Sequence, residues 1–315
     1  MIKHLHLEQI IHRAVALGPA SVAVAYPCNA MSIEAVVTAQ RMGLIEPIMV
    51  GPRSRIEAIA KENKIDLGKI EFLETGDDPV AAARAAVALC KDDQASLIMK
   101  GSLHTDELLA VAVSKEGGLR TGRRMSHAFV FDLPNYPKPL LMTDCVVNIA
   151  PGLMEKRDII QNAIDLAHIL DIARPYVAIL SAVETINPAI PGTLEAAVLS
   201  KMAERGQITG AIVDGPLSFD VAISEVAAHI KGVELHSALR PDILVVPNLE
   251  AGNMLYKQLV YLADAECAGV ILGTRVPIVL TSRADSPESR IASCALAVVY
   301  AHRQRNGNQA DDATK

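Results

Sequence analysis

In roughly the first hundred residues, short apolar runs that stop at polar residues or proline alternate with segments whose apolar residues recur at helical spacing. The apolar runs predict strands, and the spaced segments predict helices. Strands that alternate with helices of about 10 to 15 residues are typical of βαβ units, so a mostly parallel sheet is expected. The predicted strands are residues 21–26, 45–50, 69–73 and 96–99, and the predicted helices are residues 32–42, 55–63 and 78–91.

A polar segment interrupts this alternation, which then resumes to the end of the chain. Pro151-Gly152 is a candidate boundary between two domains, because such a pair ends regular structure. Residues 212–214 form an apolar-rich strand that is expected to end in a turn at Gly215-Pro216. The other predicted strands are residues 128–131, 140–142, 177–180 and 242–247, and the helices are residues 107–113, 153–170 and 221–231.

The last apolar run, residues 278–280, leads through Thr281, Ser282 and Arg283 into another segment of helical spacing. Ser286 is the expected N-cap of this helix, and Pro287 its first residue. The start of a helix offers unpaired backbone N–H groups and the positive end of the helix dipole. This stretch therefore predicts an anion site, with an ordinary polar turn as the alternative.

Polar residues also follow other predicted strands, at the edge where open α/β sheets bind ligands. Lys100-Gly101 is one such pair. Arg120, Arg123 and Arg124 lie among glycines in a loop that suits closure over an anion, although a solvated basic loop has the same composition. The remaining strand-end residues are Asp144, Asn148, Asp214-Gly215-Pro216 and Glu250-Ala251-Gly252-Asn253, with Gly252 where backbone can approach a ligand.

Composition limits the class of protein. The 315 residues suggest two domains of about 150 each. Half of the residues are hydrophobic, which is ample for a core. Tryptophan is absent, aromatic residues make up 3%, and the net charge is −6, so a nucleic-acid partner is not expected.

The five cysteines, Cys28, Cys90, Cys145, Cys267 and Cys294, are far apart and lie in apolar segments. Because no CxxC or Cys/His cluster has zinc spacing, we expect buried free thiols in a reducing cytoplasm and no metal site. A catalytic cysteine is the alternative. The chain has neither a signal-peptide pattern nor a long uncharged apolar run, so we expect a cytoplasmic protein that does not enter a membrane.

Taken in order, the strand-end motifs resemble those of the phosphate acetyltransferase and phosphate butyryltransferase family. The resemblance extends from about residue 21 to residue 301, and the Lys100-Gly101 and Ser126-His127 pairs are closer to the butyryltransferase branch. The motifs are Met99-Lys100-Gly101, Gly118-Leu119-Arg120, Ser126-His127, Thr143-Asp144, Asn148-Ile149-Ala150-Pro151, Val183-Glu184-Thr185, Val213-Asp214-Gly215-Pro216-Leu217, Glu250-Ala251-Gly252-Asn253 and Leu280-Thr281-Ser282-Arg283-Ala284-Asp285-Ser286.

This resemblance implies a fold of two three-layer α/β domains with the active site in the cleft between them, as in isocitrate and isopropylmalate dehydrogenases, and a homodimer. The first domain would comprise residues 1–145 and 275–303, and the second residues 146–274, with 304–315 as a disordered tail. The implied reaction moves a short-chain acyl group reversibly between coenzyme A and inorganic phosphate. It proceeds by direct attack in a ternary complex, without a metal or bound cofactor, and coenzyme A is a substrate.

The reaction requires a base, because a thiol with a pKa of about 8.5 must become a thiolate. By resemblance, Ser282 assists at the carbonyl and Arg283 holds phosphate with its planar guanidinium. The acetyltransferase branch has a carboxylate seven residues after the catalytic serine, where this chain has Ser289. The candidates for the base are therefore Asp285, Asp144, Glu250 and His127.

The expected catalytic residues are Ser282, Arg283, Asp285 and Asp144. The expected substrate-binding residues are Lys100, Gly101, Arg120, Ser126, His127, Asn148, Asp214, Gly215, Pro216, Glu250, Gly252 and Asn253.

Two other functions are compatible with this fold class. An NAD- or NADP-dependent hydroxyacid dehydrogenase would need a GxGxxG after the first strand or a set of metal-binding aspartates along one helix, and neither is present. A catalytically silent protein that binds acyl-CoA or phosphate is the second alternative, because the base is unassigned.

Overall fold

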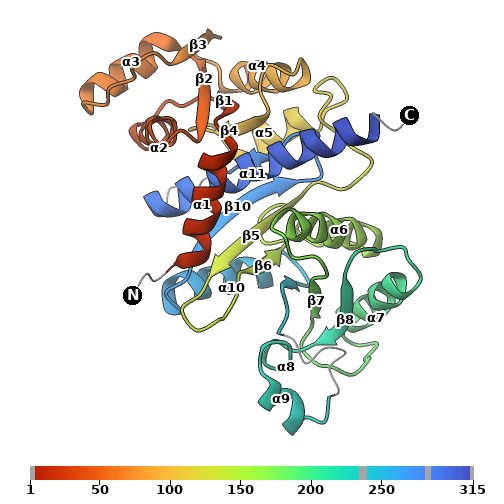
Figure 1. The fold of residues 1–315 in the computed structure, drawn as a ribbon. Helices are drawn as coiled ribbons and strands as arrows, with labels where there is room; N and C mark the ends of the chain where they lie inside the picture. The colour runs from red at the N-terminus through yellow and green to blue at the C-terminus, as the bar shows by residue number, and fades with distance from the viewer. Residues whose placement is uncertain (1–3, 234–239, 281–284, 313–315) are drawn as a thin grey trace. The chain divides into compact units, whose positions relative to one another are not determined.

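The computed structural model describes residues 4–233, 240–280 and 285–312 of a mixed α/β protein (Figure 1). The chain divides into two compact units. Leu7–Arg123 and Cys267–Lys315 form one, which we call the terminal unit. Arg124–Glu266 and the N-terminal residues through His6 form the other, the central unit. Each unit is described by itself.

The sheet of the terminal unit is mostly parallel, as the alternating pattern predicted. Its strand order is β3-β2-β1-β4-β11-β10, and only the pairing of β10 with β11 is antiparallel. The carboxyl ends of β1, β4 and β11 therefore meet at one edge of this sheet. The strands are β1 Ala20–Ala25, β2 Ile45–Gly51, β3 Glu71–Glu74, β4 Leu97–Lys100, β10 Glu266–Leu272 and β11 Ile278–Val279.

Local signals account for most helices of this unit. Asn29 and Asp78 cap α2 and α4 by accepting hydrogen bonds from backbone N–H groups of the first turn. Helix α1 was not predicted from the sequence, and the helix predicted at residues 107–113 begins two residues earlier. The helices are α1 Leu5–Leu17, α2 Ala30–Arg41, α3 Arg53–Glu62, α4 Pro79–Lys91, α5 Thr105–Ala112 and α11 Pro287–Asp312.

The last helix, α11, is central to the terminal unit. Its residues Ile291, Ala292 and Cys294–Ala301 are buried, and it contacts α2, β4 and β11. A helix that is apolar on all sides is expected to be enclosed by the core. Within the described residues α11 continues to Asp312, whereas a disordered tail was expected from residue 304.

The central unit has the strand order β5-β6-β9-β7-β8. β5 and β6 form an antiparallel hairpin, and the other pairs are parallel. The start of β5 consequently lies at the same edge as the carboxyl ends of β6, β7, β8 and β9. The strands are β5 Ser126–Asp132, β6 Leu140–Thr143, β7 Tyr176–Leu180, β8 Ile212–Leu217 and β9 Ile243–Val245, and the helices are α6 Leu153–Ile169, α7 Pro191–Glu204, α8 Phe219–Ile223, α9 Glu225–Ile230 and α10 Leu249–Leu262.

The expected turn at Gly215-Pro216 is wrong. β8 continues through both residues to Leu217, and their peptide bond is cis. Pro216 is tolerated because β8 is the last strand of the central unit's order, where a missing N–H does not interrupt a ladder. The helix predicted at residues 221–231 is divided into α8 and α9, with Ser224 between them capping α9.

Glu250-Ala251-Gly252-Asn253 lies in the first turn of α10 and not in a loop. The side chain of Asn248 accepts a hydrogen bond of 2.9 Å from the N–H of Ala251 and begins this helix.

The chain passes between the units after Arg123 and again after Glu266. The β5–β6 hairpin belongs to the central unit, where β6 pairs with β9. The expected domain limits and the expected cleft stay predictions. Within the described ranges, no helix is both long and apolar enough to span a bilayer.

Candidate active site

The terminal unit brings two predicted site segments to one edge of its sheet. β11 pairs in parallel with β4, and Val279 is opposite Met99. The next residues along each strand are Leu280 and Lys100, so the segment that leads to Ser282 starts beside Lys100. Thr281, Ser282, Arg283 and Ala284 themselves lie outside the described residues.

Gly101 is required by a close approach of two strand ends. Its N–H donates to the carbonyl of Ala25 at 2.8 Å, and a Cβ here would lie 2.3 Å from the carbonyl oxygen of Tyr26. No side chain fits in that space. Half-buried Lys100 donates through Nζ to the carbonyls of Gly101 at 3.2 Å and Leu103 at 3.1 Å. Gly101 thus fixes the backbone from which the Lys100 ammonium projects.

A polar cluster beyond β1 was not found from the sequence. The Tyr26 hydroxyl donates to the Asp77 carboxylate, and Arg55 contacts both groups at 2.8 Å. Burial, together with the hydrogen bond to Asp77, raises the pKa of Tyr26 to about 12. The three residues lie far apart in the sequence, so spacing alone contained no signal of this cluster.

The five cysteines are free and buried, as predicted. Burial raises the pKa of the Cys28 thiol to about 11, and of the Cys90 and Cys294 thiols to about 12. Thiols with such values are not ionised at neutral pH, which disfavours these three as nucleophiles.

Two arginines of the basic loop, Arg120 and Arg124, have different surroundings. Arg120 forms an isolated β-bridge with Thr274, and its side chain is exposed. Arg124, in contrast, forms an ion pair of 3.0 Å with Glu155 and donates through Nε to Asn148 at 2.7 Å. Arg120 is therefore more available to an anion than Arg124.

The expected cap of the last helix is present. The hydroxyl of Ser286 accepts a hydrogen bond of 2.9 Å from the N–H of Ser289. The carbonyl oxygen of Asp285 accepts one of 2.7 Å from Arg290 Nη2. Asp285 is thus held at the start of α11, directly after the segment that contains Ser282.

In the central unit, the Asp144 carboxylate joins the two strands of the β5–β6 hairpin. Oδ1 accepts from the N–H groups of Val146 at 2.9 Å and Val147 at 3.0 Å. Oδ2 accepts from Asn148 Nδ2 at 2.6 Å and from the N–H of His127 at 3.2 Å. Burial raises the pKa of Asp144, and the four hydrogen bonds oppose this rise. Such a carboxylate is better suited to holding the strand ends than to accepting a substrate proton.

Asn148 and Ser126 extend this network. Asn148 Nδ2 also donates to the carbonyl of Met125 at 2.9 Å, and Asn162 Nδ2 donates to Ser126 Oγ at 2.9 Å. Asn162 and Arg124 were not among the predicted site residues. The signal for Asn162 was its helical spacing from apolar Ile159 and Leu166, three residues before it and four residues after it in a predicted helix.

His127 is almost completely buried, with 1% of its surface exposed. Its ring packs edge-on against Phe129, with ring centres 4.3 Å apart, and Nδ1 has no hydrogen-bond partner among the described residues. Burial lowers the pKa of His127 to about 3. The imidazole is therefore neutral near pH 7 and would be a poor base there.

The other predicted residues of this unit have different surroundings. Asp214 accepts a hydrogen bond of 3.2 Å from the Tyr176 hydroxyl. A Cβ on Gly215 would lie 2.8 Å from Ile179 Cβ, and one on Gly252 would lie 2.7 Å from Val246 Cγ2 and 3.1 Å from Cys145 Cα. Asn253 Nδ2 is 3.5 Å from the Cys145 carbonyl, whereas Glu250 is exposed. At Gly252, helix α10 packs closely against Val246 and Cys145.

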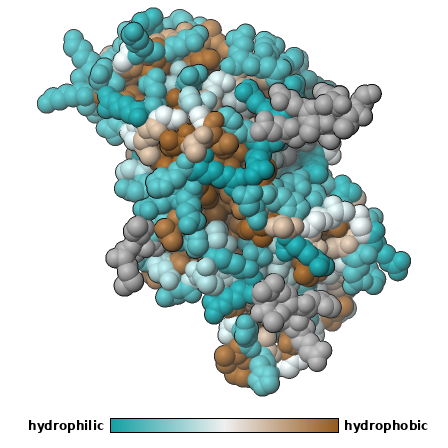
Figure 2. All heavy atoms as spheres, viewed as in Figure 1, coloured by the Kyte–Doolittle hydropathy of each residue, from teal (hydrophilic) through white to brown (hydrophobic). Residues whose placement is uncertain are grey.

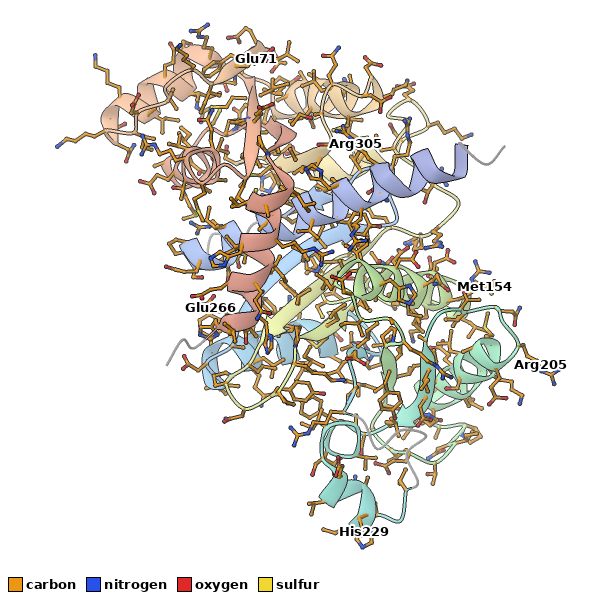
Figure 3. The ribbon with its side chains drawn as sticks, in the orientation of Figure 1. Glu71, Met154, Arg205, His229, Glu266 and Arg305 are labelled. Carbon is orange, nitrogen blue, oxygen red and sulfur yellow. The ribbon has the colours of Figure 1, made fainter. Side chains whose placement is uncertain are left out.

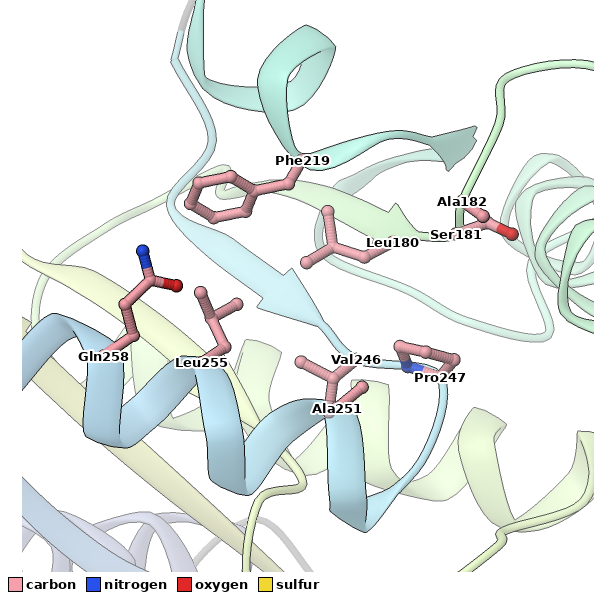
Figure 4. A pocket seen from close by; sticks show the side chains of 9 residues that line it. All are labelled: Leu180, Ser181, Ala182, Phe219, Val246, Pro247, Ala251, Leu255 and Gln258. Carbon is pink, nitrogen blue, oxygen red and sulfur yellow. The ribbon is translucent and has the colours of Figure 1, made fainter.

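An apolar pocket of about 390 Å³ lies between β7, β9 and α10 (Figure 4). Gln258 and Ser181 are its polar members. This pocket was not predicted from the sequence, because its wall comes from several separate segments. It is lined by Leu180, Ser181, Ala182, Phe219, Val246, Pro247, Ala251, Leu255 and Gln258.

Comparison with known proteins defines the class. A crystal structure of a branched-chain phosphotransacylase from Enterococcus faecalis V583 is similar with a TM-score of 0.79 and 33% sequence identity. The match covers 90% of this chain and 99% of that one. The fold is thus that of the phosphotransacylases.

A family model for phosphate acetyl/butaryl transferase matches residues 77–298, which include every predicted site residue. The phosphate acetyltransferase of Rhizobium meliloti is 52% identical over 95% of this chain and 94% of its own length. The phosphate butyryltransferase of Clostridium acetobutylicum is 42% identical over 96% and 99%. The chain belongs to the phosphate acetyl/butaryl transferase family, a family of transferases. These identities do not favour the butyryltransferase branch expected from the Lys100-Gly101 and Ser126-His127 pairs.

His127 should make stability depend on pH. The pKa is about 3 in the folded chain and about 6.5 when unfolded, so below pH 6.5 only the unfolded chain takes up the proton. This contribution to stability is complete above pH 6.5 and is lost as the pH falls towards 3. Between pH 7.5 and pH 5, wild-type protein should lose about 2 kcal/mol more unfolding free energy than His127→Gln.

Urea unfolding at the two pH values measures this difference. The matched control is His229→Gln, because His229 is exposed on α9 (Figure 3). Equal pH dependence in wild type and His127→Gln would refute the assignment of a buried, neutral His127.

Proposed function

We propose that this chain transfers a short-chain acyl group reversibly between coenzyme A and inorganic phosphate, by direct attack in a ternary complex. Membership of the phosphate acetyl/butaryl transferase family is the observation that carries this proposal. The cations and helix start at the carboxyl edge of the terminal sheet support it, because both substrates are anions. Among the described residues no group of three or more potential metal ligands was found, and the proposed reaction requires none.

The proposed step exchanges one bond at the acyl carbon for another. In the direction of acyl-CoA synthesis, the sulfur of coenzyme A attacks the carbonyl, the bond from carbon to the phosphate oxygen breaks, and phosphate leaves with the electron pair. A base removes the thiol proton. In the other direction a phosphate oxygen attacks the thioester, and the thiolate leaves and regains the proton.

In this proposal Ser282 donates to the carbonyl oxygen as it gains charge, and Arg283 holds the phosphate. Both roles come from the family resemblance. The strand pairing supports a shared site with Lys100, because the segment leading to Ser282 leaves β11 beside the end of β4. Lys100 and exposed Arg120 supply further positive charge for the phosphates of the two substrates.

We assign the base to Asp285. Asp285 directly precedes the N-cap Ser286 and lies three residues after Ser282 in the chain. Its carbonyl oxygen accepts a hydrogen bond from Arg290 Nη2. Asp144 fits this task less well, because each of its oxygens already accepts two hydrogen bonds. The low pKa of His127 disfavours the imidazole, and Ser289 has no carboxylate.

The central unit contributes the second group of substrate-binding residues in this proposal. Asp144 acts there as a positioning residue that holds His127 and Asn148 at the sheet edge, and Asn162 holds Ser126. We keep Asp214, Gly215, Pro216, Glu250, Gly252 and Asn253 as residues that shape the same edge.

We further propose that the protein is a cytoplasmic homodimer. The central unit exposes large apolar side chains on α9 and α10, and Figure 2 shows apolar surface over the α9 end. A second copy that covers this surface would remove it from water. Light scattering on the purified protein should give twice the mass of 33.6 kDa, and a monomer at micromolar concentration would refute the dimer. The exposed residues are Val226, Ile230, Met254, Tyr261 and Leu262.

Phosphate-dependent release of free thiol tests the activity directly. Purified protein with acetyl-CoA or butyryl-CoA should release thiol at a rate that rises and saturates with phosphate. No release above blank with any short acyl-CoA would refute the transferase and favour a silent binding protein. Comparing acyl-CoA substrates from acetyl to hexanoyl gives the preferred chain length. We expect a soft preference, in which activity changes by about tenfold per methylene.

Replacement of Arg283 tests phosphate recognition. Arg283→Ala should raise KM for phosphate at least about tenfold, because a charge-assisted pair is lost, and Arg283→Lys should recover only part of this. Arg205→Ala is the control, since Arg205 is exposed at the end of α7 (Figure 3). An unchanged phosphate dependence in Arg283→Ala would remove this residue from its assigned role.

A further inference from the structure

Arg290 is a buried arginine in the first turns of α11, with 9% of its surface exposed. Its N–H donates to the carbonyl of the N-cap Ser286 at 3.2 Å. Its Nη2 donates to the carbonyl of Asp285 at 2.7 Å. The guanidinium therefore points back along the helix and lies at its N-terminal end, as the direction of helical side chains requires.

The positive charge of this side chain is not balanced by the groups around it. Within the described part of the chain, no carboxylate forms an ion pair with Arg290, and Nε is buried without a hydrogen-bond partner. Buried charges in proteins are normally paired, because removal from water disfavours the ionised form strongly. A carbonyl oxygen satisfies one N–H group but supplies no net negative charge.

The helix adds to this imbalance. The N-terminus of an α-helix has a partial positive charge, so a cation there is disfavoured, and anions are favoured. The N–H of Ser289 already donates a hydrogen bond to Ser286 Oγ. Backbone N–H groups alone therefore do not account for an anion site at this helix start. A bound anion would offset both the guanidinium charge and the helix dipole.

The sheet places Arg290 on the side where the other expected anion contacts gather. α11 follows β11, which pairs in parallel with β4, the strand that ends at Lys100. The carbonyl that Arg290 holds belongs to Asp285, the assigned base. Arg290 was not among the residues predicted from the sequence, where it is a polar residue just before the apolar part of the last helix.

We propose that Arg290 binds a phosphate group of a substrate at the start of α11. This rests on the proposed transfer between coenzyme A and phosphate, and it adds a binding cation to that site. The phosphate group belongs either to inorganic phosphate and the acyl phosphate, or to coenzyme A. In both cases the guanidinium supplies a charge-assisted hydrogen bond from Nε.

Thermal unfolding with added ligand tests this without requiring activity. The variants are Arg290→Gln, which removes the charge, and Arg290→Lys, which keeps the charge but loses the planar fork. The control is Arg305→Gln, at an exposed position near the other end of the same helix (Figure 3). Potassium phosphate, coenzyme A and 3′-dephospho-coenzyme A are the ligands, with potassium chloride matching the ionic strength.

Wild type and Arg305→Gln should be stabilised by phosphate, and Arg290→Gln should need at least about tenfold more phosphate for the same shift. If the bound group belongs to coenzyme A, Arg290→Gln should instead weaken the stabilisation by coenzyme A. If that group is the 3′-phosphate, the substitution should not weaken the stabilisation by 3′-dephospho-coenzyme A. Arg290→Lys should recover part of the affinity. Ligand affinities unchanged within twofold in Arg290→Gln, or no ligand-induced shift in wild type, would overturn the proposal.

Stability without ligand separates this role from a structural one. Arg290→Met replaces the unbalanced charge by an apolar side chain of similar length, so it should unfold at the same temperature as wild type or higher. A lower unfolding temperature with unchanged phosphate affinity would mean that Arg290 serves only to hold Asp285. If wild type binds phosphate through Arg290 but transfers no acyl group, the transferase proposal fails and this one stands.

Discussion

The parallel pairing of β4 with β1 and β11 is the constraint on which the rest of the terminal unit depends. It brings the ends of three strands from distant parts of the sequence to one edge. The contact between Gly101 and the Tyr26 carbonyl is so close that only glycine fits. Lys100 at the end of β4 thereby lies beside Leu280 at the end of β11, the strand that α11 follows in the chain.

In the central unit a single carboxylate has the corresponding role. Asp144 accepts hydrogen bonds from the backbone of its own turn, from Asn148 and from the start of β5. These contacts use up the acceptor capacity that a general base would need. In the proposed mechanism Asp144 is therefore a positioning residue, and Asp285 is proposed as the base because it lies three residues after Ser282 in the chain.

Much of the fold could be predicted from local patterns. Strands β1, β2 and β4 and the cap at Ser286 follow from apolar runs and a short polar side chain. The turn at Gly215-Pro216 was wrong, because pairing with β7 overrides the local turn preference. The packing of α10 on Cys145 at Gly252 was not predicted, because it joins segments far apart in the sequence. The Tyr26 cluster, the apolar pocket and Arg290 depend on long-range contacts or burial, which one sequence does not display.

The central claim is that phosphate attacks the acyl group directly. Exchange of labelled coenzyme A into acetyl-CoA tests this, measured with and without phosphate. Direct attack predicts exchange only when phosphate is present, because the acyl group must first pass to phosphate before labelled coenzyme A can take it back. Exchange at a comparable rate in phosphate-free protein would require an acyl group held on the enzyme, and would contradict the account.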